Sequence, residues 1–68
     1  MTTLLTREAR ATAYGMAGHA IIMMVEETPW LAPDDGTEAD DRRIRKILRQ
    51  IAQRHHNHAA KLRSSEAT

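Results

Sequence analysis

The sequence predicts an all-α fold, an antiparallel hairpin of two helices, on three observations. Two long segments without proline flank one short segment that holds both prolines of the chain. Apolar residues in both long segments recur at steps of three and four, which is the period of an amphipathic helix. The chain has eleven alanines, one tyrosine, one tryptophan and no phenylalanine, a composition that favours close-packed helices over a β-sandwich.

The proline-containing segment sets the boundaries within a single domain, residues 1–68. Each proline disfavours a helical conformation of the residue before it, and Asp34, Asp35 and Gly36 are residue types typical of turns. Thr37 has the side chain of a helix N-cap and is followed by acidic residues, which suit the first turn of a helix. We expect a helix over about 4–28, a turn over 29–36, a helix over about 37–63 and a frayed tail over 64–68.

The first helix is apolar over most of its circumference, which predicts burial on more than one side. A hairpin supplies only one neighbour, so we expect two hairpins to dimerise into a four-helix bundle. Gly15 and Gly18 indicate either a close approach of a second backbone or a kink in this helix. The residues expected in the self-association surface are Ala9, Ala13, Met16, Ala17, Ala20, Ile21 and Met24 of the first helix and Ile44, Leu48 and Ile51 of the second.

The small size of the chain favours the same expectation. A domain of 68 residues buries only about 60% of the surface of its unfolded chain, and such domains commonly need a disulfide, a metal or a partner. The absence of cysteine excludes disulfides and thiolate metal sites. A homo-oligomer is therefore the first expectation, and folding against a different protein or a stable monomer are the alternatives.

Neither a secretory signal nor a membrane span is recognisable in the sequence. The N-terminal residues MTTLLTREAR place polar and charged side chains where a signal peptide needs an apolar core. The uncharged stretch 11–25 is shorter than the roughly 20 residues that cross a bilayer. We expect a cytoplasmic protein that does not bind membranes.

Charges are sorted into blocks along the chain. Residues 26–41 hold seven acids and no base, and residues 42–63 hold eight bases and no acid, with a formal net charge of +1. A basic helical face could contact the phosphates of nucleic acid. The alternative is that these charges complement the helix dipole, keep the protein soluble and orient an assembly. The low net charge and the lack of aromatic residues for base stacking disfavour nucleic acid. The residues of the basic face are Arg42, Arg45, Lys46 and Arg49.

The turn carries the one tryptophan of the chain, next to a leucine and two acids. Tryptophan is enriched in binding hot spots, so Trp30, Leu31, Asp34 and Asp35 form a candidate docking surface for another protein. The alternative is that Trp30 folds back and covers the open end of the hairpin. The sequence leaves both possibilities open.

Three of the four histidines lie within four positions, which raises the question of a metal site. His55 and His58 fall on the apolar seam of the second helix, and His56 points away from it. Folding the hairpin about Ala32 places the first two near Glu8, but zinc takes four ligands and the chain has no metal-binding motif. We expect a structural role for the histidines, with loss of assembly below about pH 6.5 as a further possibility, and no cofactor.

No catalytic motif accompanies these features, and two helices do not enclose a substrate pocket. The sequence therefore predicts a protein that is not an enzyme. We expect a small protein–protein interaction module, a structural or regulatory adaptor of phage or bacterial accessory type that binds itself and one unidentified protein. The alternative is a nucleic-acid-binding protein that uses the basic face of the second helix.

Overall fold

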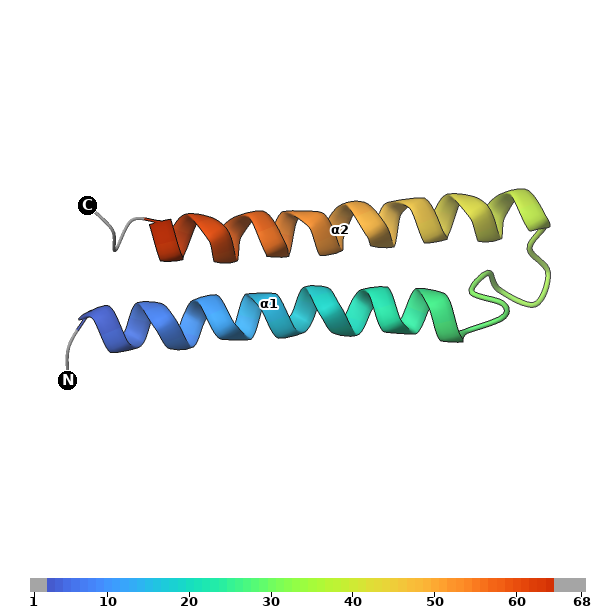
Figure 1. Cartoon of the computed structure of the whole chain (residues 1–68). Coiled ribbons are helices and arrows are strands. Elements are labelled where there is room, and N and C mark those ends of the chain that lie inside the picture. The colour runs from blue at the N-terminus through green and yellow to red at the C-terminus, as the bar shows by residue number, and fades with distance from the viewer. Residues whose placement is uncertain (1–2, 65–68) are drawn as a thin grey trace.

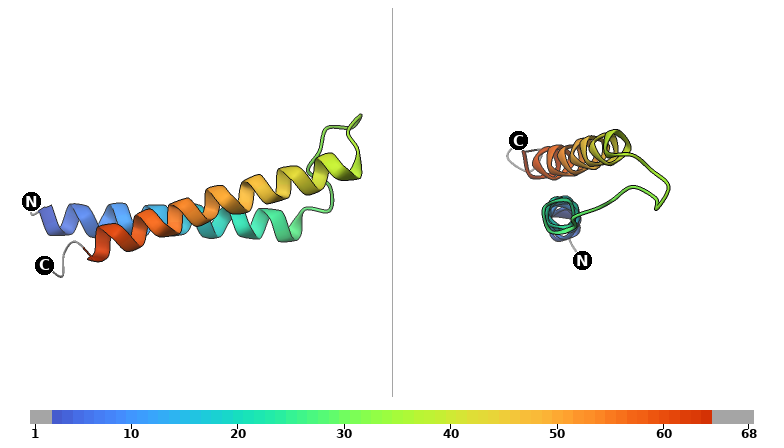
Figure 2. Two further views of the ribbon diagram at one scale, coloured as in Figure 1. Left: turned by 90° about the horizontal axis from the view of Figure 1, so that it is seen from above. Right: turned by 90° about the vertical axis from the view of Figure 1, so that its right-hand side faces the viewer.

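The computed structural model describes residues 3–64 as two long helices that run antiparallel, side by side (Figures 1 and 2). Helix α1 spans Thr3–Glu27 and helix α2 spans Glu38–Ser64. The expected hairpin is thereby confirmed, with each helix boundary within one residue of its predicted place. Ser64, expected in the frayed tail, ends α2 instead, and the rest of that tail, 65–68, lies outside the described residues.

The start of α2 is fixed by the capping interaction that the sequence predicts. The Thr37 hydroxyl oxygen accepts a hydrogen bond from the Asp40 amide (3.2 Å), and the Asp40 carboxylate accepts one from the Thr37 amide (2.9 Å). This reciprocal pair satisfies two amides that a helix N-terminus would otherwise leave unpaired. The Thr37 amide, the Thr37 hydroxyl group and the nearby charge of Arg43 hold the pKa of the Asp40 carboxyl below its usual value. A turn precedes the cap, with the Gly36 amide bound to the Pro33 carbonyl at 2.8 Å.

The two helices are offset along their length. Arg45 reaches the C-terminal carbonyls of α1, and Tyr14 stacks on His58, so folding about Ala32 misplaces the contacts by roughly one heptad. The linker is the physical cause, because it does not bend symmetrically. It runs back along the first turns of α2, where the Leu31 amide binds Asp41, and α2 reaches past the end of α1 at the turn (Figure 1).

The interior of the hairpin consists of very small side chains. Among the described side chains, those of residues 6–64, the buried apolar residues are three alanines of the helices, Ala32 of the linker and Val25, which is the largest. Gly18 is also buried, and a Cβ atom there would lie 3.0 Å from the Ala52 carbonyl oxygen and 2.9 Å from His56 Nε2. A glycine at this position lets the two backbones approach closely. The close approach expected at one of the two glycines is therefore found at Gly18, whereas Gly15 has open space around it.

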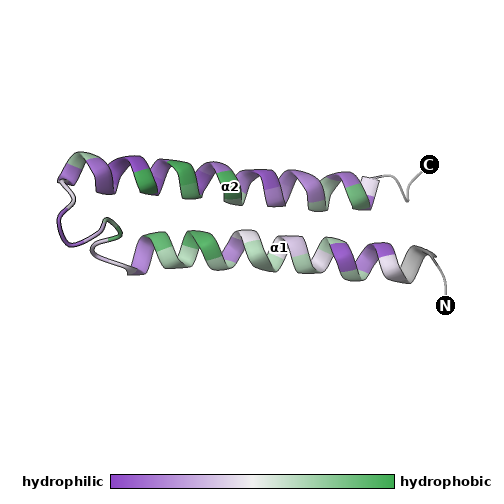
Figure 3. Ribbon diagram, turned by 180° about the vertical axis from the view of Figure 1, so that it is seen from behind, coloured by the Kyte–Doolittle hydropathy of each residue, from purple (hydrophilic) through white to green (hydrophobic). Residues whose placement is uncertain are grey.

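The chain is elongated. Its principal extents are 50 × 18 × 15 Å and its radius of gyration is 15.6 Å, against about 11 Å for a compact domain of this length. Hydrophobic colour is concentrated in the half of α1 next to the turn, whereas α2 is mostly hydrophilic with separate apolar positions (Figure 3). A hairpin of this shape leaves much of each helix uncovered.

Candidate interaction surfaces

The end of the hairpin next to the turn is held by Arg45. Its guanidinium donates to the Val25 carbonyl (Nη1, 2.6 Å) and to the Thr28 carbonyl (Nη2, 2.8 Å). The same group binds the Asp41 carboxylate through Nε at 2.7 Å and Nη2 at 3.4 Å. Helix α1 has no basic residue in its own last turn, so Arg45 of α2 supplies the positive charge that the C-terminus of a helix favours.

Asp41 binds both the Arg45 guanidinium and the linker, and we call this pair of residues the Asp41–Arg45 latch. Besides Arg45, its carboxylate accepts a 2.7 Å hydrogen bond from the Leu31 amide. The Arg45 side chain, followed by the Leu31 and Ala32 amides, holds the pKa of Asp41 below its usual value. The Asp41–Arg45 latch therefore ties the linker, the end of α1 and the start of α2 together. The spacing of an acid and a base four residues apart was visible in the sequence, but its use in closing the turn was not predicted.

The Asp41–Arg45 latch holds the backbone of the linker against α2. Trp30 is 41% exposed, and its Nε1 lies 3.4 Å from the Pro33 carbonyl within the same linker. Leu31 is half-buried, while Asp34 and Asp35 are exposed. The candidate docking residues thus lie together at one end of the molecule, with the indole ring partly accessible.

One long side of the hairpin is apolar. A groove of about 390 Å³ between the helices is lined by Ala13, Tyr14 and Ala17 of α1 and by His55 of α2 with Arg10 at its edge. Helical periodicity continues this side along both helices. We call this surface the apolar face; its residues are Ala13, Ala17, Ala20 and Met24 of α1 and Ile44, Ile47 and Ile51 of α2.

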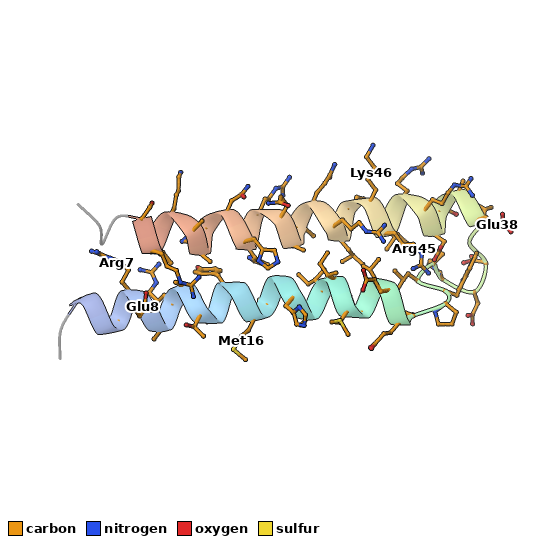
Figure 4. The ribbon with its side chains drawn as sticks, in the orientation of Figure 1. Arg7, Glu8, Met16, Glu38, Arg45 and Lys46 are labelled. Atoms are coloured by element: carbon orange, nitrogen blue, oxygen red, sulfur yellow. The ribbon has the colours of Figure 1, made fainter. Side chains whose placement is uncertain are left out.

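The apolar face is incompletely covered by the fold. Met24 and Ile47 are 43% and 48% exposed. Met16 lies beside this face and points away from α2 (Figure 4), with 67% of its surface exposed. Of the residues expected to mediate self-association, Ala9, Ala13, Met16, Ala20 and Met24 are exposed, and Ala17, Ile21, Ile44, Leu48 and Ile51 are half-buried.

The basic residues of α2 line a second surface. Arg42, Arg45, Lys46 and Arg49, together with Gln50 and Gln53, line an open groove of about 520 Å³, and Lys46 points outward in Figure 4. These positions do not contribute equally. The Arg45 guanidinium is bound in the latch, with 20% of its side chain exposed, and Arg42 lies 4.0 Å from the Glu38 carboxylate. Lys46 and Arg49 are exposed.

The three histidines of α2 lie against α1. Tyr14 stacks on His58, with ring centroids 4.2 Å apart, and lies 5.8 Å from the His55 ring. The expectation that His56 points away from the seam is wrong, because its ring lies over Gly18. Glu8, expected near His55 and His58, lies instead 4.0 Å from Arg63, a consequence of the offset between the helices.

Within the described part of the chain, no three metal-binding side chains come together. Neither helix, over the residues that the structure describes, has the length and apolar character needed to cross a membrane. The chain matches no known family model, no curated protein and no solved structure. Its function must therefore be inferred from its own surfaces.

Proposed function

We propose that the protein is a small interaction module that self-associates through the apolar face and docks on another protein through its turn. The observation that carries this proposal is the inverted distribution of side-chain size. Among the described side chains of the two helices, the buried apolar ones are three alanines and one valine, and larger ones such as Ile21 and Leu48 are only half-buried, whereas Met16, Met24 and Ile47 are exposed. Large apolar side chains usually provide most of the burial in a core, so the hairpin alone leaves its main source of stability unused.

The exposed area supports a second copy as the occupant of the apolar face. A compact monomer of this mass exposes roughly 4,300 Å², whereas the hairpin exposes 5134 Å². The excess of roughly 800 Å² reflects the elongated shape of the hairpin, which offers a long side large enough for a stable interface of about 800 Å² per partner. Two hairpins packed through this face would form a four-helix bundle.

Two matched substitutions test the self-association. Ile47→Gln changes a side chain on the apolar face, and Lys46→Gln changes its exposed neighbour, which points away from α1. Complete burial of an isoleucine contributes about 1.5–3 kcal/mol, and Ile47 is 48% exposed, so association buries about half of this side chain in each of two copies. Ile47→Gln should therefore raise the dimer dissociation constant about tenfold or more. Light scattering over a wide concentration range should show this loss for Ile47→Gln only. A wild-type chain that stays monomeric at high micromolar concentration would refute the self-association.

The turn is the proposed docking site for the second partner. The Asp41–Arg45 latch fixes the linker before binding, and a pre-ordered aromatic residue loses little conformational entropy when it binds. Trp30→Ala should therefore leave the helix content, the thermal midpoint and the solution mass nearly unchanged. A large loss of thermal stability in this variant would show instead that the indole serves to close the end of the hairpin.

A second candidate function is nucleic-acid binding through the basic groove of α2, which is favoured by the continuous strip of Lys46, Arg49, Gln50 and Gln53. The Arg45 guanidinium is bound to Asp41, which reduces the positive charge that the basic groove can offer to phosphates. Fluorescence anisotropy with a labelled 20-base-pair duplex at 50 and 200 mM salt decides the matter. Affinity that falls steeply with salt and is lost in Lys46→Gln/Arg49→Gln supports it, and no binding at 50 mM salt refutes it.

A further inference from the structure

We propose that two copies of the chain pack through their apolar faces with their turns at opposite ends of the bundle. This inference rests on the proposed self-association and specifies the arrangement of the second copy. Two symmetric arrangements are open to two hairpins packed face to face. Either the turns lie at the same end and α1 packs on α2 of the second copy, or the turns lie at opposite ends and α1 packs on α1 of the second copy.

Charge along the long axis favours turns at opposite ends. The half of the hairpin next to the turn, residues 19–52, holds seven acids and five bases, a net charge of −2. The other half, residues 1–18 and 53–68, holds five bases and two acids, a net charge of +3. Turns at the same end would bring like charges together at both ends, whereas turns at opposite ends place each acidic half beside a basic one, and electrostatic complementarity of this kind selects orientation.

Several acids near the turn have no base beside them in the hairpin. Those at positions 38, 40 and 41 lie near Arg42, Arg43 and Arg45, respectively. No ion pair is found for Glu26, Glu27, Asp34 or Asp35 in the described part of the chain. At the far end, Lys61 is likewise exposed and outside any ion pair among residues 3–64. The charges left over at the two ends are therefore opposite in sign.

Side-chain size along α1 agrees with this arrangement. The half of the apolar face near the N-terminus of α1 carries Ala13 and Ala17, and the half near the turn carries Ala20 and Met24. When α1 packs antiparallel on its own copy about a point between Gly18 and His19, Ala17 meets Ala20 of the second copy, and Ala13 meets the second copy's Met24. Small residues at the centre allow close approach, and a large side chain above a small one fills the space on each side.

Distances between spin labels test the orientation directly. The chain has no cysteine, so Ala39→Cys and Ala60→Cys each provide one labelling site, and both positions are exposed and outside the apolar face. Ala39 lies 13 residues from Ala52, which is opposite Gly18. At 1.5 Å per residue, turns at opposite ends place two Ala39 labels about 40 Å apart, whereas turns at the same end place them within about 20 Å. Pulsed electron–electron double resonance resolves this difference.

A mixture of the two labelled chains provides a second distance. The Ala39-to-Ala60 separation between copies should be about 20 Å with turns at opposite ends and about 30 Å with turns at the same end. Two Ala39 labels about 40 Å apart with the shorter mixed distance would support the proposed arrangement. Two Ala39 labels within about 20 Å in a protein of dimeric mass would overturn the orientation and leave the self-association intact. A monomeric mass with no dipolar coupling would overturn both.

Discussion

Alanine substitution at the two glycines of α1 tests the close approach of the helices. Gly15 and Gly18 lie one turn apart in the same helix, so replacement by alanine gives both the same gain in helix propensity, up to about 1 kcal/mol. Their surroundings differ. A Cβ at Gly15 meets nothing within 4 Å, whereas a Cβ at Gly18 meets the Ala52 carbonyl oxygen at 3.0 Å. Gly15→Ala serves as the matched control for Gly18→Ala.

The magnitudes follow from these distances. Gly15→Ala should stabilise the protein by about 0.5–1 kcal/mol, since only the propensity changes. Overpacking of a close contact costs about 1–3 kcal/mol, so Gly18→Ala should destabilise the protein by about 1 kcal/mol after the gain in propensity. For a chain of 68 residues, 1 kcal/mol corresponds to roughly 4–8 °C in the thermal midpoint. The thermal midpoint should therefore rise in Gly15→Ala and fall in Gly18→Ala, and the midpoints of the two variants should differ by about 10 °C.

Circular dichroism melts at one fixed protein concentration measure this difference, because association makes the midpoint depend on concentration. The variant Gly18→Ala/His56→Ala, compared with His56→Ala alone, removes the ring and leaves only the Ala52 carbonyl as the obstacle, so it should show part of the cost of the single substitution. Equal stabilisation by Gly15→Ala and Gly18→Ala would refute the close approach, since the helices would then lie farther apart at Gly18 than described.

Three further predictions concern the turn. Arg45→Met should lower the free energy of unfolding by about 2 kcal/mol, because two helix-end carbonyls and the Asp41 carboxylate lose their donor; Arg42→Met, whose ion pair is exposed, should change it by less than about 0.5 kcal/mol in the same urea titration. Thr37→Ala should cost about 1 kcal/mol through loss of the N-cap, with Thr12→Ala as an exposed threonine control in thermal melts. The pKa of Asp41 is lowered in the folded state, so the stabilisation by this carboxylate is complete at neutral pH and is lost as the pH falls below about 4. Asp41→Asn should therefore be less stable than wild type at pH 7 and should lose less further stability between pH 5 and pH 2 in urea titrations. An acid dependence equal to that of wild type would contradict the latch.

Local chemistry made the helices and the turn predictable. The two prolines, the Asp-Asp-Gly turn and the Thr37 cap each act within four residues along the chain, and Thr37 caps α2 as expected, with the Asp40 amide as its partner. Such short-range preferences need no knowledge of the packing. For this reason the sequence predicted both boundaries of the linker within one residue.

Packing between the helices was less predictable, because alanines occupy several faces of α1 and give similar patterns in different registers. Folding the linker symmetrically about Ala32 was wrong, since the latch between Leu31, Asp41 and Arg45 holds the linker against α2. A shift of about one heptad leaves the same stripes facing each other, so periodicity alone could not reveal it. The wrong register also gave wrong neighbours for the histidines of α2, because the shift places His58 beside Tyr14 and His56 beside Gly18 instead of near Glu8.

The distribution of side-chain size explains why one hairpin can have a well-defined interior and an open face at once. Alanine and glycine allow the backbones of α1 and α2 to approach closely, which fixes the pair but buries little apolar area per residue. A methionine or isoleucine in place of Gly18 or Ala52 would separate the helices, so the larger apolar residues either flank this contact half-buried, as Ile21 and Leu48 do, or lie on the open face, as Met24 and Ile47 do. A second layer of helices is the arrangement that lets those residues contribute to stability without widening the first contact. Polar substitution at Met24 or Ile47 should accordingly weaken the association of the hairpins far more than the contact between α1 and α2 within one chain.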